Sequence, residues 1–416
     1  MKKSIKSIAT LFVAAFALLL VTGTTSKAAT IFTANIKQTA QSDTSVKLSW
    51  DEYIGAEKAS HYHVLISNDG RNFGFKDYDI GATTTINGLA PGKKYFVKVC
   101  AMKNSHFNHR DTYAASDVMA ESEMIEIATA PEVGKPANVR QTAAGNNSVT
   151  IAWDAVAGAT SYTVYRRDGY WDLAKVADTN ATSYTIGGLT NSYAADYVVT
   201  ATASLSVNNG SYTVSETGSN SDSVTAKTIP AKTLGLAMTT YYDAISVAYY
   251  GWSTTTNCDG YQFQTLTYKG KKLVDNTLTG TSIRIDPFKK NVFTKTRVRA
   301  YVNVNGQKVY GAWSSYSFYA SSSKMKMVRS ANKKKITLTW KKVSGVSQYK
   351  VYVSTKENSR YKLVKTLSSK KSKCVITKYG KKKLKKGKRY YVRLKYIGKN
   401  GKKKVTSGIV GAGSVY

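Results

Sequence analysis

The segment Leu89-Ala-Pro-Gly-Lys-Lys-Tyr-Phe-Val-Lys-Val99 carries the clearest structural pattern in the chain. Its second half alternates, which predicts a β-strand whose buried face is formed by Tyr95, Val97 and Val99. The dipeptide Pro91-Gly92 predicts a tight turn immediately before that strand. A turn followed by a half-buried strand is typical of an antiparallel sheet protein, so the comparison of other segments with this one decides the fold.

Similar strands recur along the chain. A strand that alternates apolar and polar residues and ends in an aromatic ring is predicted at residues 46–50, 149–153, 245–249 and 336–340. A following strand that contains a tyrosine is predicted at residues 61–64, 161–164, 260–263 and 348–351. The first set is spaced by 103, 96 and 91 residues, which is close to the length of one β-sandwich.

The pair Leu89 and Tyr95 resembles the E–F corner of fibronectin type III domains, in which a tyrosine near the start of strand F bonds back to upstream backbone. Leu384 and Tyr390 keep the same spacing in the fourth repeat, the spacing is wider in the second, and the third has no tyrosine at the matching place. The resemblance implies an all-β protein, a tandem array of four fibronectin type III-like (immunoglobulin-like) antiparallel β-sandwiches.

The repeats predict domains at residues 29–131, 132–230, 231–320 and 321–416, after a signal peptide at residues 1–28. The third domain is the most divergent and the fourth is rich in lysine. Each repeat is long enough to fold alone, and we expect each to unfold as a unit.

The first 28 residues have the composition of a secretory signal, because Lys2, Lys3 and Lys6 precede an apolar stretch at 8–21 and small residues near Ala28. The alternative is an uncleaved membrane anchor, for which the apolar stretch is short. The sequence shows no sorting motif or hydrophobic tail near residue 416. We therefore expect a secreted or extracellular protein that can associate with a cell wall and has no membrane span in the mature chain.

The three cysteines Cys100, Cys258 and Cys374 fall in three different repeats, so no disulfide is expected within a repeat. Cys374 is predicted to be buried in strand E, and Cys100 to face outward at the end of strand F. The four repeats account for residues 30–416, and no nucleophile elbow, phosphate-binding glycine loop or His-Glu-x-x-His motif is present. We therefore predict a protein that is not an enzyme and needs no cofactor.

All four histidines lie in the first repeat. Their positions, on neighbouring strands C and F and in the F–G connection, allow a cluster with one cysteine that is suited to zinc or copper. The members of this candidate metal site are His61, His63, Cys100, His106 and His109. The alternative is that exposed histidines lie near each other by chance, since no tetrahedral ligand spacing is fixed by the sequence.

Aromatic side chains are abundant in the third repeat and at the C–C′ hairpin of the second. Exposed rings stack on sugars or anchor protein partners, so three tryptophans are candidates for aromatic binding, namely Trp171, Trp252 and Trp313. The alternative is that these rings are structural, and at Trp313 packing is favoured over binding.

The formal net charge of +36 is concentrated in residues 321–416, which hold 30 lysines and arginines and a single acidic residue, Glu357. Charge this one-sided destabilises a domain through self-repulsion and therefore favours a polyanionic partner. The A–B and E–F connections of a sandwich meet at one end, so a dense cationic pole is predicted there. Its residues are Lys333, Lys334, Lys335, Lys381, Lys382, Lys383, Lys385, Lys386, Lys388 and Arg389.

These features favour a secreted bacterial binding or adhesion protein, similar to surface proteins of Gram-positive bacteria. The fourth domain is expected to contact an anionic cell-wall polymer or a sulfated glycan, and the first three an unknown protein or glycan. Nucleic acid is not expected as a physiological partner. The alternatives are a carbohydrate-binding accessory protein for extracellular polysaccharide use and a secreted factor that acts on a host protein.

Overall fold

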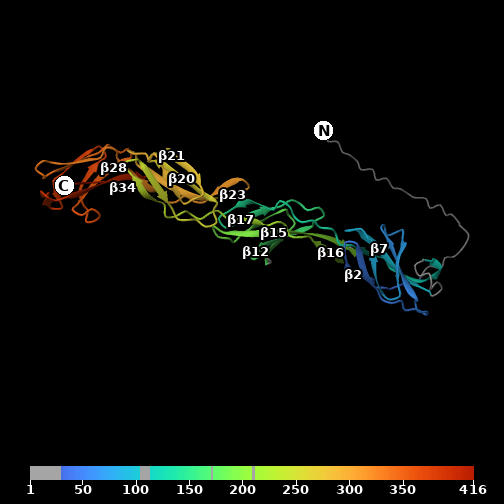
Figure 1. The fold of residues 1–416 in the computed structure, drawn as a ribbon. Coiled ribbons are helices and arrows are strands. Elements are labelled where there is room, and N and C mark those ends of the chain that lie inside the picture. The colour runs from blue at the N-terminus through green and yellow to red at the C-terminus, as the bar shows by residue number, and fades with distance from the viewer. Residues whose placement is uncertain (1–29, 104–112, 170–171, 209–210) are drawn as a thin grey trace, which may run out of the picture. The chain divides into compact units, whose positions relative to one another are not determined.

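The computed structural model describes residues 30–103, 113–169, 172–208 and 211–416. Within these ranges the regular structure is β, except for one short 3-10 helix, η2 (Ala115–Asp117). The predicted signal peptide and three of the candidate site residues, His106, His109 and Trp171, lie outside the described residues. Figure 1 shows the strands in chain order, coloured from blue to red.

The first sandwich has a three-stranded sheet ordered β2-β3-β6 and a larger sheet ordered β1-β8-β7-β4-β5, with β9 also paired to β7. All pairs are antiparallel except β1 with β8. Its strands are β1 (Thr30–Phe32), β2 (Lys37–Gln41), β3 (Ser45–Ser49), β4 (His61–Ser67), β5 (Gly74–Asp79), β6 (Thr83–Asn87), β7 (Lys94–Met102), β8 (Val118–Ser122) and β9 (Ile125–Ala128).

The second and third sandwiches repeat this plan, with sheets β10-β11-β14 and β13-β12-β15-β16, then β18-β19-β22 and β21-β20-β23-β24. The strands of the second are β10 (Arg140–Ala144), β11 (Val149–Ala152), β12 (Ser161–Arg167), β13 (Leu173–Thr179), β14 (Ser183–Ile186), β15 (Ala194–Val207), β16 (Tyr212–Thr217) and β17 (Val224–Lys227). Those of the third are β18 (Ala237–Tyr242), β19 (Val247–Gly251), β20 (Gly260–Thr267), β21 (Lys272–Leu278), β22 (Ser282–Ile285), β23 (Thr294–Val304), β24 (Gln307–Tyr310) and β25 (Ser317–Tyr319).

The fourth sandwich pairs a sheet of strands A, B and E (β26-β27-β30) with a sheet of strands C′, C, F and G (β29-β28-β33-β34). A small extra sheet, β31-β32, lies in the E–F connection. The strands are β26 (Lys326–Arg329), β27 (Ile336–Thr339), β28 (Val346–Ser354), β29 (Lys362–Ser368), β30 (Lys373–Ile376), β31 (Lys378–Tyr379), β32 (Lys382–Lys383), β33 (Tyr390–Asn400) and β34 (Lys403–Val415). The all-β sandwich architecture predicted from the sequence is confirmed.

The chain forms two compact units. The first contains residues up to Glu132 together with Ser204–Ser215, and the second contains Val133–Ala203 and Glu216–Tyr416. The third and fourth sandwiches and most of the second therefore share one compact unit. In the described residues, no helix is long and apolar enough to cross a membrane.

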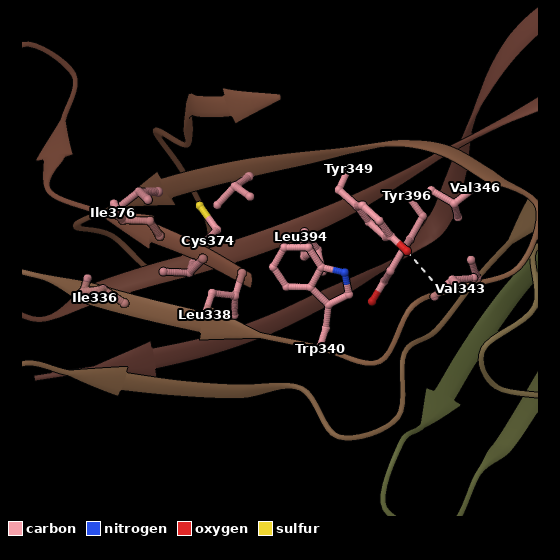
Figure 2. Close-up of a cluster of buried hydrophobic side chains, with 14 of the residues drawn as sticks. Ile336, Leu338, Trp340, Val343, Val346, Tyr349, Cys374, Ile376, Leu394 and Tyr396 are labelled. Atoms are coloured by element: carbon pink, nitrogen blue, oxygen red, sulfur yellow. Dashed lines mark hydrogen bonds between the residues drawn. The ribbon is translucent and has the colours of Figure 1, made fainter. Parts of the chain in front are cut away.

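Each sandwich core is built around a tryptophan at the end of strand B that packs on a tyrosine of strand C. The ring centroids are 5.1 to 5.7 Å apart, in the pairs Trp50–Tyr62, Trp153–Tyr162, Trp252–Tyr261 and Trp340–Tyr349. Each tyrosine hydroxyl accepts a hydrogen bond from a backbone N–H of the B–C connection, at Tyr53, Val156, Thr255 and Val343. Figure 2 shows this bond from Val343 to Tyr349 in the fourth sandwich, beside Trp340. Because the bond satisfies a buried polar group, the tyrosine fixes the B–C connection against the core.

The register predicted for strand B of the third repeat is wrong by three residues. The sequence pattern places Tyr249 where the other repeats have tryptophan, whereas the structure places Trp252 there, nine residues before Tyr261. Ile245, which the pattern assigned to the core, is 64% exposed, and Ser246 has a positive φ of 56°. The strand therefore begins after a local turn, and Tyr250 and Trp252 supply the inward face.

Strand F follows the predicted alternation, with Val97, Val199, Val298 and Val392 buried in their respective cores. The tyrosine corner is present in the first and fourth sandwiches, where Tyr95 and Tyr390 accept hydrogen bonds from the backbone N–H groups of Ala90 and Lys385. In the third sandwich, Tyr319 of β25 instead accepts a bond from the backbone N–H of Met238.

A buried serine in strand G contacts strand F in the first three sandwiches. Its hydroxyl oxygen accepts the valine N–H at 2.9 to 3.0 Å, in the pairs Ser122–Val99, Ser221–Val199 and Ser314–Val298. The serine replaces a ladder bond, so strand G divides into two short segments at this point. In the fourth sandwich strand G is the single long strand β34.

The third and fourth sandwiches share buried contacts. Phe293, in the E–F connection of the third, is 1% exposed and belongs to the core cluster of the fourth. Its backbone N–H donates to the carbonyl oxygen of Ser344 at 2.8 Å. At Gly398 an added Cβ would lie 2.5 Å from the Phe293 ring, so only glycine allows this approach.

Candidate functional site

The ten predicted cationic residues of the fourth sandwich, here called the cationic end, lie in the A–B and E–F connections. All are exposed except Lys333, which is partly buried. The E–F part begins with a small hairpin in which Lys378 pairs with Lys383 and Tyr379 with Lys382. The hairpin therefore orders the backbone of Lys382 and Lys383 within the E–F connection.

Arg329, at the end of strand A, joins the two connections. Its guanidinium donates to the carbonyl oxygen of Lys333 in the A–B connection, from Nε at 3.1 Å and from Nη2 at 2.9 Å. The same group donates to the carbonyl oxygens of Lys385 and Lys388 in the E–F connection, each at 2.6 Å. The structure therefore brings together the two lysine-rich connections that the sequence predicted to meet.

The side chain of Arg329 is 8% exposed and its guanidinium carbon lies 5.2 Å from the ring centroid of Tyr390. The hydroxyl of Tyr390 also accepts a hydrogen bond from the backbone N–H of Lys385. The tyrosine corner and Arg329 therefore both bind the backbone of the E–F connection at Lys385. The carbonyl oxygens supply the hydrogen bonds that this buried guanidinium requires at the base of the cationic end. Sequence reasoning missed Arg329, because it is one cation among many in this region.

The C–C′ hairpin also reaches the E–F connection. The hydroxyl of Tyr379 donates to the carbonyl oxygen of Arg360 at 3.1 Å. Glu357, the only acidic residue between 321 and 416, lies in this hairpin. The fourth sandwich consequently has almost no carboxylate of its own to neutralise its lysines, and its surface field is strongly positive.

The structure brings together three of the five candidate metal ligands. His61 and His63 are 3% and 1% exposed, and their Nε2 atoms lie 3.1 Å apart. Cys100 is directly opposite His63 in the pairing of β4 with β7. No group of three or more side chains with the geometry of a metal site occurs among the described residues. His106 and His109 lie outside them, so the metal site stays a prediction.

Cys100 points away from the main core, as predicted, but it is not exposed. It is fully buried in a second cluster with Leu65 and Met102, against which Phe75 and Val118 pack. Burial, with a smaller contribution from the negative charge of Glu121, raises the pKa of the Cys100 thiol to about 12. Cys374 is buried as predicted, and desolvation raises the pKa of its thiol as well.

Two of the three candidate aromatic-binding residues are described, and neither presents a free ring. Trp252 is 7% exposed and forms part of the core, which corrects its assignment to a binding surface. The ring of Trp313 contacts two guanidinium groups, whose carbons lie 3.9 Å (Arg297) and 4.3 Å (Arg299) from its centroid. Trp313 therefore packs, as the sequence favoured.

The two arginines of this stack are themselves held in place. Arg297 and Arg299 each donate two hydrogen bonds to a glutamine Oε1 of strand C, that of Gln264 and Gln262, respectively. Tyr310 lies 3.8 Å from the guanidinium carbon of Arg299. On this face of the third sandwich, arginine side chains and aromatic rings therefore contact one another through cation–π interactions, and the glutamines accept the hydrogen bonds of the arginines.

Comparison with known proteins assigns a family to the first sandwich. A family model described as "Fibronectin type III domain" matches residues 32–113, which lie in the first sandwich. The crystal structure of the FN1–FN3 domains of chicken CNTN1 is similar at 16% sequence identity and a TM-score of 0.29, covering 71% of this chain and 99% of that chain. The family match places a fibronectin type III domain in the first sandwich, and the sheet orders described above show that a similar antiparallel β-sandwich recurs three more times along the chain.

Proposed function

We propose that this chain is a non-enzymatic extracellular binding protein whose fourth sandwich holds a linear anionic polymer, such as a cell-wall polymer or a sulfated glycan. The observation that carries the proposal is the clamp of Arg329 on the carbonyl oxygens of Lys333, Lys385 and Lys388. By holding two lysine-rich connections together, the buried Arg329 concentrates positive charge at one end of the sandwich. An ordinary soluble surface would carry positive and negative side chains side by side.

The lysine bias of the cationic end favours a partner recognised by charge density. An ammonium group is a compact point charge, whereas the planar guanidinium of arginine suits bidentate recognition of a fixed partner. Such a surface binds repeated phosphate or sulfate groups with little sequence or sugar specificity, and its affinity falls steeply with salt. Secretion, predicted from residues 1–28, makes extracellular polymers the relevant class.

The test replaces five exposed lysines of the E–F connection with glutamine, namely Lys381, Lys382, Lys383, Lys385 and Lys386. Teichoic acid or heparin is then titrated into the full chain at several salt concentrations. Affinity should drop, and the slope of log affinity against log salt should become shallower. Wild-type binding that does not respond to salt, or unaltered binding by the variant, would contradict the proposal.

A further inference from the structure

The outer face of the larger sheet in the fourth sandwich carries a second set of cations. Along β33, Tyr390, Val392 and Leu394 are buried, so the residues between them point to the opposite face. Arg393 and Lys395 lie on that outer face and are partly exposed. The chain thus places cations at alternate positions of strand F, away from the core.

The charged groups on this face rest on aromatic rings. The guanidinium carbon of Arg393 lies 3.9 Å from the ring centroid of Tyr361, and its Nη2 donates to the carbonyl oxygen of Glu357 at 3.2 Å. The ammonium group of Lys395 lies 5.2 Å from the ring centroid of Tyr352. These contacts orient the cations and leave their charge uncompensated.

Like charges face one another across this sheet. Lys395 is directly opposite Lys350 in the pairing of β33 with β28, and Lys399 is directly opposite Lys404 in the pairing with β34. Like charges at directly opposite positions destabilise a sheet. An external anion bound over these pairs would relieve this repulsion.

The same strand connects two charged regions. β33 begins one residue after Arg389 of the cationic end and extends to the exposed residue Lys399 beside the F–G hairpin. Ten residue steps of extended chain separate Arg389 from Lys399, which corresponds to about 33 Å. Arg389, Arg393, Lys395 and Lys399 therefore form a row, here called the β33 row, along the length of the sandwich.

We infer that a linear polyanion lies along the β33 row, from the cationic end to the F–G hairpin. This inference rests on the proposed function and deepens it, because it requires an extended polymer with repeated phosphate or sulfate groups. A short anion can neutralise only the cationic end. A chain of roughly 33 Å or more covers both charged regions and the opposed pair Lys395 and Lys350 between them.

The experiment uses the full chain and two probe series of graded length, inorganic polyphosphate and heparin oligosaccharides, titrated by calorimetry. Affinity at equal concentration of anionic groups should rise with length and level off once the probe exceeds about 33 Å. The row variant is Arg393→Gln with Lys395→Gln. It should lower the affinity for long probes about fivefold or more, reduce the salt slope by about 1.4 to 1.8, and change short-probe affinity little.

The matched control is Lys326→Gln with Lys373→Gln. Both lysines are exposed and flank Thr339 on the outer face of the other sheet, so the control removes the same charge elsewhere in the same sandwich. Urea denaturation of each variant checks folding. Lys395→Gln alone serves as the row variant if loss of Arg393 unfolds the sandwich.

Equal losses in the row and control variants, or length-independent affinity, would overturn the β33 row and leave the proposed function standing. Absence of binding by the wild-type chain to both probe series would overturn both. A greater loss in the row variant, confined to long probes of either series, supports the inference.

Discussion

The Nη2 atom of Arg329 lies 2.6 Å from the carbonyl oxygen of Lys385, so a buried side chain of strand A holds the backbone of the E–F connection. This contact joins the two parts of the cationic end through main-chain atoms. The lysine side chains above it stay free to meet a partner. The stability of this end and its charge density therefore depend on one residue.

Replacing Arg329 with methionine should destabilise the fourth sandwich by about 1–3 kcal/mol, because three carbonyl oxygens lose a charged donor. Polyanion affinity should fall too, as the two connections separate. Urea denaturation and a heparin titration measure the two effects. The control Arg389→Met removes an exposed cation and should change stability by less than about 0.5 kcal/mol. Unchanged stability in Arg329→Met would contradict the role of the clamp.

In the third sandwich, Trp252→Ala should cost about 3–5 kcal/mol, since this ring fills the strand-B core position. Tyr249→Ala should cost much less, because the side chain of Tyr249 is only partly buried on the other face. Chemical denaturation followed by hydrogen exchange of β19 and β20 separates the two. A larger effect at Tyr249 would restore the register predicted from the sequence.

Trp340→Ala in the fourth sandwich should also destabilise the third, contrary to the sequence-based expectation that each repeat unfolds alone. The physical reason is Phe293, which belongs to the third sandwich in sequence and to the core of the fourth in space. Hydrogen exchange should show faster exchange in both β23 and β33, while β7 of the first sandwich keeps its protection. Loss of protection restricted to β33 would refute the coupling.

The thiol of Cys100 should resist alkylation in the native protein at pH 8, because burial raises its pKa to about 12. The partly exposed Cys258 should react first, and all three thiols should react in urea. The shift also has a consequence for stability. The unfolded thiol ionises above its ordinary pKa of about 8.5, so stability of the first sandwich that is present below this pH is lost progressively toward pH 12.

That loss can be measured by thermal melts between pH 8 and 11, with Cys100→Ala as the comparison. The variant leaves a small cavity but should show a shallower decline of Tm with pH than the wild-type chain. Equal slopes in the two proteins would show that other groups dominate the alkaline transition.

Trp313→Ala should lower the stability of the third sandwich by about 1–3 kcal/mol, since two guanidinium groups lose a stacking ring. It should leave binding to neutral glycans unchanged, because two guanidinium groups already lie over the ring. A glycan array on wild type and variant provides the check. Selective loss of a glycan signal at full stability would reassign Trp313 to a binding surface.

The sequence was sufficient to predict the β-sandwich fold, because alternation in strands B, C and F is imposed by one buried face and recurs along the chain. It failed for strand B of the third repeat, since Ile245, Val247 and Tyr249 also alternate and only the turn at Ser246 breaks the pattern. Alternation reports which face a residue occupies. It does not report where the strand begins.

The candidate sites show the same limit. The lysine-rich connections are local in sequence, so their meeting at one end followed from topology. The position of Arg329 beneath them depends on three carbonyl contacts that no spacing encodes. Cys100 was correctly placed on the outer side of strand F, but its burial depends on Phe75 and Val118 from other strands.

The insertion of Phe293 beside Gly398 has a practical meaning for dividing the chain. A fragment that begins at residue 321 lacks Phe293, so the apolar surface that this ring covers in the fourth sandwich would be exposed to water. Such a fragment should aggregate through that surface. A fragment that begins at residue 231 contains Phe293, which covers this surface. The smallest excisable piece that contains the lysine-rich sandwich is therefore a pair of repeats, although the strands of the third and fourth sandwiches divide between Tyr319 and Lys326.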